Sequence, residues 1–134
     1  MAKSIGMVEL NSIARGIYTA DQMVKISDVD IVTAGSTCPG KYIAIVEGDV
    51  AAVKASIELG EEVAGEFYVD SMVIPNVNLQ VFPAISGATM PERIQALGIF
   101  ESFSLATMIY AADQILKAAE VDAIELRLGN GLGG

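Results

Sequence analysis

The chain has 134 residues, 52% of them hydrophobic, which is enough apolar material for one domain or two small ones. Its formal net charge of −9 argues against nucleic acid and anionic membrane surfaces as partners, because both require clustered lysines and arginines. A single cysteine excludes an internal disulfide and fits a reducing cytoplasm, and the lack of histidine removes the commonest general base and metal ligand. The sequence begins without the apolar segment of a signal peptide and holds no apolar run as long as a membrane span.

The first segment predicts a strand followed by an amphipathic helix. Residues 4–10 are expected to form the strand, with Asn11 or Ser12 as the N-cap of the helix. The apolar side chains at helical spacing, expected to form its inner face, are Ile13, Ile17, Ala20 and Val24. Asp21 and Lys25 lie four residues apart on a more polar face, in the order that favours an ion pair.

Three further strands and a second helix are expected before residue 77. Residues 29–34 and 42–46 are β-rich and are separated by a loop at residues 35–41. Asp49 is the expected N-cap of a helix whose inward positions are Val50, Val53, Ile57 and Gly60. Residues 67–74 predict the last strand. The order β-α-β-β-α-β is the split βαβ arrangement, an α+β fold with both helices on one face of an antiparallel sheet.

The segment 76–93 is rich in turn-forming residues and predicts a connector without secondary structure. After it, residues 98–122 repeat residues 6–30 without a gap, and nearly half of the aligned positions are identical. The apolar face of the first helix recurs as Leu105, Ile109, Ala112 and Leu116. The second copy extends only just beyond its second strand, too little to bury its own apolar face. Either the sequence is a piece of a longer chain, or another chain completes this copy.

Three separated motifs resemble the bacterial microcompartment shell domain. They are Gly-Met-Val-Glu at residues 6–9, Ala-Asp-x-Met-Val-Lys at residues 20–25 and Gly-Asp-Val-x-Ala-Val at residues 48–53. The resemblance implies a complete shell domain at residues 1–76, a linker at 77–93 and a partial second shell domain at 94–134. Two domains in tandem are similar to the pseudohexameric shell proteins, in which three chains supply six domains around a central pore.

This resemblance implies a structural protein and not an enzyme. The chain is expected to form a homotrimer that packs as a tile beside other shell proteins of a microcompartment in the bacterial cytoplasm. Lys25 and Lys117 match the lysine by which such tiles meet at their edges, although on physical chemistry alone they are solvated helix residues. Glu9 and Glu101 recur once per copy, which predicts a repeated structural hydrogen bond and argues against acid–base catalysis.

The resemblance gives Cys38 the most specific role. From the residues alone, both an unreactive thiol and a ligand stay open, because the cysteine lies between Thr37 and Pro39 in a turn where packing does not require it. Residues 37–41 and 82–87 are similar to the tandem shell proteins of propanediol-utilisation compartments. By this resemblance, Cys38 of three chains would together hold an iron–sulfur cluster of the 4Fe–4S kind at the pore, for electron or cluster transfer across the shell.

The glycine-rich end of the sequence occupies the place of the cysteine loop in the second copy and is expected to line the same pore. The expected pore-loop residues are Ser36, Thr37, Cys38, Pro39, Gly40, Gly129, Asn130, Gly131 and Gly133. Two other classes of protein stay open at this point. One is a ferredoxin-like regulatory domain that binds a small molecule in a polar pocket, and the other is a soluble iron–sulfur electron carrier without a shell.

Overall fold

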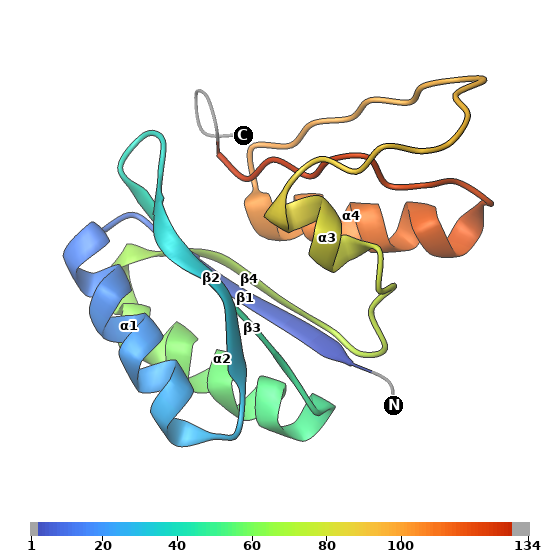
Figure 1. The fold of residues 1–134 in the computed structure, drawn as a ribbon. Coiled ribbons are helices and arrows are strands. Elements are labelled where there is room, and N and C mark those ends of the chain that lie inside the picture. The colour runs from blue at the N-terminus through green and yellow to red at the C-terminus, as the bar shows by residue number, and fades with distance from the viewer. Residues whose placement is uncertain (1–2, 130–134) are drawn as a thin grey trace.

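The computed structural model describes residues 3–129 and contains a four-stranded antiparallel sheet with helices on both faces (Figure 1). The strand order is β2-β3-β1-β4. The elements are β1 (Ser4–Leu10), α1 (Ile13–Ile26), β2 (Asp30–Thr37), β3 (Lys41–Gly48), α2 (Val50–Ala64), the 3₁₀ turn η1 (Gly65–Phe67), β4 (Tyr68–Ile74), α3 (Val81–Ser86) and α4 (Leu105–Ala118). The predicted α+β fold and the β-α-β-β-α-β order of the first segment are confirmed.

The sheet separates two hydrophobic cores. Side chains of a strand point alternately to its two faces, and β1 is buried along its whole length because both faces are covered. Ile5 and Met7 contribute to the core beneath α3 and α4, whereas Val8 and Leu10 contribute to the core beneath α1 and α2. The two helices of the first copy therefore lie on one face, as predicted, and the later helices cover the other (Figure 1).

The predicted inner face of α1 is partly wrong. Ser12 is the N-cap, with its hydroxyl accepting a hydrogen bond from Arg15 N, but Ile13 and Ile17 are about half exposed. The buried residues are Gly16, Thr19, Ala20 and Met23. The reason is the close approach of α1 to the sheet at Gly16, where a Cβ would lie 2.3 Å from Cγ of Tyr42. The face of α1 that packs within the first copy is therefore the one that contains Gly16, and not the one that contains the larger Ile13 and Ile17.

The helix α2 follows the prediction more closely. Val53, Ile57 and Gly60 are buried, whereas Val50 in the first turn is exposed, contrary to expectation. A Cβ on Gly60 would lie 2.8 Å from Sδ of Met23, so this glycine lets α1 and α2 pack closely.

The connector contains an unexpected helix, α3. Val81 and Ala84 are buried against the sheet, and burial of this apolar side stabilises a short helix that composition alone did not predict. Pro83 is accommodated because it falls in the first turn, where its missing N–H would have no partner within the helix. The helix α4 forms as the repeat predicts, with Ser104 as its N-cap.

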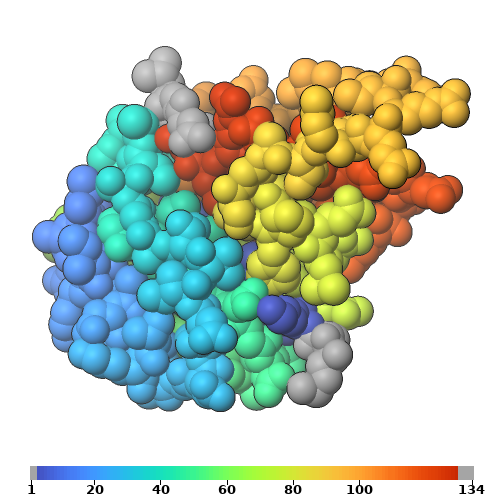
Figure 2. Space-filling view, in the orientation of Figure 1, coloured from blue at the N-terminus to red at the C-terminus, as the bar shows by residue number. Residues whose placement is uncertain are grey.

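The two strands expected in the second copy do not form among the described residues. In the first copy, β1 pairs with β3 and β4, and residues 94–134 contain no counterparts of those two strands. A strand without a partner leaves its backbone groups unpaired, which explains the difference. Residues 123–128 instead lie beside α3, where Leu126 N donates to the carbonyl oxygen of Ala84, and the residues after β4 form one side of the molecule (Figure 2).

Candidate functional site

The Cys38 loop is a tight turn between β2 and β3. The strands extend further than predicted, with Ser36 paired with Tyr42 and Thr37 with Lys41, so that the turn contains only residues 38–40. The turn residues are all exposed, and the Cys38 thiol is free. Gly40 has φ 74°, a left-handed conformation that glycine adopts without strain. The hairpin therefore presents one thiol at the edge of the molecule.

The two predicted pore segments lie together. Cys38 N donates a hydrogen bond of 3.2 Å to the carbonyl oxygen of Gly129. Gly129 has φ 75°, and a Cβ there would lie 2.6 Å from Cβ of Thr37, so glycine is needed both for the backbone conformation and for the contact. The remaining predicted pore residues, Asn130, Gly131 and Gly133, lie outside the described residues.

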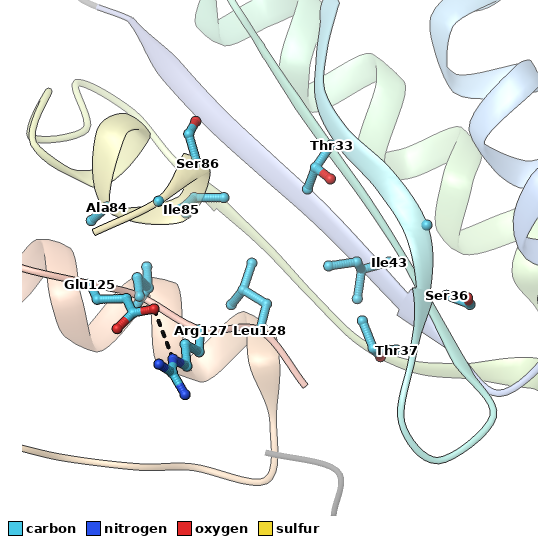
Figure 3. Close-up of a pocket in the computed structure, with 13 residues that line it drawn as sticks. Thr33, Ser36, Thr37, Ile43, Ala84, Ile85, Ser86, Glu125, Arg127 and Leu128 are labelled. Atoms are coloured by element: carbon cyan, nitrogen blue, oxygen red, sulfur yellow. Dashed lines mark hydrogen bonds and ion pairs between the residues drawn. The ribbon is translucent and has the colours of Figure 1, made fainter. Parts of the chain in front are cut away.

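A cavity of about 330 Å³ lies behind this hairpin, between the sheet, α3 and residues 125–128 (Figure 3). Thr33 and Ile43 line it from the sheet, and Ser86 lines it from the end of α3. Its charged lining residues among those described are Glu125 and Arg127, which pair with each other at 2.8 Å, and the hydrogen bond from Arg127 to Glu125 raises the pKa of Arg127. These charges satisfy each other and do not point to a ligand.

Glu9 forms a buried polar contact between the two copies of the repeat. Its fully buried carboxylate pairs with Lys41 Nζ at 2.8 Å and accepts hydrogen bonds from Leu105 N at 2.9 Å and Ala106 N at 3.4 Å. These two N–H groups belong to the N-terminus of α4, where a negative charge is favoured by the helix dipole. The predicted structural role of Glu9 fits these contacts. The sequence did not indicate that the partner of Glu9 is the helix of the other copy. The available signal was that this glutamate and the N-cap serine both recur in the second copy.

The two predicted edge lysines occupy equivalent places in α1 and α4. Lys25 pairs with Asp21 at 2.6 Å and Lys117 pairs with Asp113 at 2.7 Å, both at i,i+4 spacing. Lys25 is exposed, whereas Lys117 neutralises an aspartate that is fully buried. Glu101 is exposed, unlike its counterpart Glu9.

The fold and the repeat define the class of protein. The chain matches the BMC domain family over residues 4–77 and 96–133 and belongs to that family. It is a structural protein of the shell of a bacterial microcompartment, in the cytoplasm, and not an enzyme. No helix within residues 3–129 has the length and hydropathy needed to cross a membrane.

Three individual proteins are similar to this chain. The chain is 41% identical over 134 residues to the bacterial microcompartment shell protein PduT of Citrobacter freundii, covering all of this chain and 73% of the relative. It is 33% identical over 146 residues to the carboxysome assembly protein CcmO of a Synechocystis strain, covering 96% of this chain and 48% of the relative. The crystal structure of a microcompartment protein from Desulfitobacterium hafniense superposes with a TM-score of 0.90 at 50% identity, covering all of this chain and 74% of that one. The chain thus spans about three quarters of two of these proteins and half of the third.

Proposed function

We propose that three chains assemble into a pseudohexameric tile with a central pore, and that such tiles pack with other shell proteins. The observation that carries this proposal is the tandem repeat, in which the helix of the second copy packs on the sheet of the first. Each chain then contributes two neighbouring positions of a six-fold arrangement, and three chains complete the ring.

Sedimentation of the full-length protein tests the assembly. The expected mass is three times that of the chain, and electron microscopy of concentrated protein is expected to show sheets or tubes. A regulatory domain or a soluble electron carrier would form no sheets or tubes. A stable monomer at high concentration would contradict the proposal.

We further propose that Cys38 from three chains holds an iron–sulfur cluster at the pore. The thiol is exposed at the tip of the β2–β3 turn, and thiolate is the ligand that iron–sulfur clusters take. Residues 3–129 of one chain contain no group of three or more cysteine, histidine, aspartate or glutamate residues that could hold a metal. A cluster would therefore need ligands from several chains. When bound, it would supply one-electron transfer, and the chain itself contributes a thiol whose backbone N–H is fixed to Gly129.

Cys38→Ser tests this site. Full-length protein incubated with iron and sulfide without oxygen is expected to bind both and to absorb visible light, whereas Cys38→Ser is expected to bind neither. Ser36→Ala is the matched control, since it changes an exposed residue of the same hairpin and removes no thiol. Trimer mass and circular dichroism should be equal in all three proteins. If the wild-type protein takes up no iron, the cluster proposal is wrong and the shell function is unaffected.

A further inference from the structure

The turn that carries Cys38 has little support from its own copy of the repeat. Residues 38–40 are exposed, and no described atom outside its chain neighbours lies within 4 Å of a Cβ built on Gly40. Within residues 3–129, one backbone hydrogen bond joins this turn to the second copy, from Cys38 N to the carbonyl oxygen of Gly129 at 3.2 Å. The position of the thiol therefore depends on a residue of the other copy.

Gly129 is itself held firmly by the residues that precede it. Leu126 and Leu128 are only 5% and 9% exposed and belong to the core beneath α3 and α4. Leu126 N also donates a hydrogen bond of 2.9 Å to the carbonyl oxygen of Ala84. Because a close-packed core leaves little room for movement, the carbonyl oxygen of Gly129 is a fixed acceptor for the Cys38 turn.

The contact between Gly129 and Thr37 is close and carries a cost. The two residues hold the same position in the two copies of the repeat, and glycine in the second copy is what lets them meet. Thr37 Oγ1 is buried there and has no hydrogen-bond partner in the part of the chain that the structure describes. A buried hydroxyl without a partner destabilises a fold, so this contact calls for an explanation other than stability.

We propose that Gly129 is a positioning residue for the Cys38 site. Its carbonyl oxygen fixes the turn so that the thiols of three chains converge. This inference rests on the proposed three-chain cluster and deepens it, because the first copy supplies the ligand and the second copy supplies the position of that ligand. Position is important because ligands must be held within about 0.5 Å of the productive geometry.

Arsenite is the probe, because it reports the geometry of three thiols without iron or sulfide. Arsenous acid condenses with three thiols, so that three As–S bonds form and three water molecules leave, with no change of oxidation state. Soft thiolate ligands suit such a centre. The reduced, metal-free, full-length wild-type protein is expected to bind one arsenite per trimer. Cys38→Ser is expected to bind none.

The deciding comparison is Gly129→Ala with Gly65→Ala. In Gly129→Ala the new Cβ would lie 2.6 Å from Cβ of Thr37, at a φ of 75°, so the segment must move away from the turn. Gly65 has φ 55° and meets no described atom within 4 Å, so its alanine variant has a similar backbone cost without that contact. We expect the Kd for arsenite to rise at least about tenfold in Gly129→Ala and to stay at the wild-type level in Gly65→Ala.

A second pair of variants serves if Gly129→Ala does not fold or does not trimerise. Thr37→Gly removes the side chain that contacts Gly129 and adds no clash. Ser36→Gly introduces the same backbone freedom at the exposed neighbouring residue and is the matched control. Only Thr37→Gly should weaken arsenite binding. Circular dichroism and trimer mass are the folding controls for all variants.

The outcomes separate this inference from the cluster proposal. Wild-type affinity for arsenite in folded, trimeric Gly129→Ala, or equal weakening in Gly65→Ala, overturns the positioning role, as does equal binding by the second pair. A wild-type protein that binds arsenite but takes up no iron refutes the cluster, and the arsenite comparison still decides the role of Gly129. A wild-type protein that binds neither refutes both.

Discussion

At the scale of one residue, Glu9 shows how a buried contact joins the two copies of the repeat. A buried carboxylate is costly unless it is paired, and here the pairing partners come from two places: Lys41 of the same copy and the helix N-terminus of the other. The sequence predicted a structural hydrogen bond because one glutamate recurs per copy. It could not predict the partner, because Leu105 follows Glu9 by 96 positions and no local pattern connects them.

Replacing Glu9 with Gln tests this contact. The amide keeps the size and an acceptor oxygen, but it loses the charge that faces Lys41 and the α4 dipole. We expect the free energy of unfolding, measured in urea, to fall by about 3 kcal/mol. Glu47→Gln is the control, since it removes the exposed Lys3–Glu47 pair at 3.0 Å and should cost less than about 1 kcal/mol. Equal losses in the two variants would show that burial of Glu9 carries no special stabilisation.

At the scale of elements, periodicity predicted the first copy well and the second copy only in part. Strand alternation and helical spacing are local signals, so the β-α-β-β-α-β order followed from them. Helical spacing cannot tell which of two apolar faces packs within the chain, and α1 has two. The strands predicted for the second copy needed hydrogen-bond partners that residues 94–134 do not supply. The helix α3 was missed because its stability comes from tertiary burial of Val81 and Ala84.

The close contact of α1 with the sheet gives an element-scale prediction. Gly16→Ala would raise helix propensity by about 1 kcal/mol, but the new Cβ would lie 2.3 Å from the Tyr42 ring. We expect the contact to dominate and the free energy of unfolding to fall by about 1–3 kcal/mol. Gly35→Ala is the control, because no described atom outside its chain neighbours lies within 4 Å of the added Cβ. A gain in stability for Gly16→Ala would mean that α1 can move away from the sheet at little cost.

At the scale of the whole molecule, the candidate site at Cys38 rests on resemblance, and it stays a prediction. Cys38 and Gly129 belong to different copies, and their hydrogen bond brings together two loops that the repeat merely aligned. Composition predicted an acidic protein, and this charge would become important where the proposed tiles meet, because a net charge of −9 per chain repels neighbouring chains. A lysine at a tile edge would offset this repulsion locally.

The edge role of Lys25 can be tested by charge reversal. Lys25 is the cleaner of the two lysines, because its partner Asp21 is about half exposed, whereas Lys117 neutralises the buried Asp113. Lys25→Asp would place two carboxylates one helical turn apart, at a cost of only about 0.5 kcal/mol to the fold. If Lys25 meets a neighbouring tile, the reversal adds repulsion there, and sheets should disappear from electron micrographs while the trimer mass is unchanged. Lys54→Asp makes the same change of charge at an exposed position of α2 and should leave the sheets intact. Sheets formed equally by both variants would assign Lys25 to the solvated surface of α1 and to its ion pair with Asp21 alone.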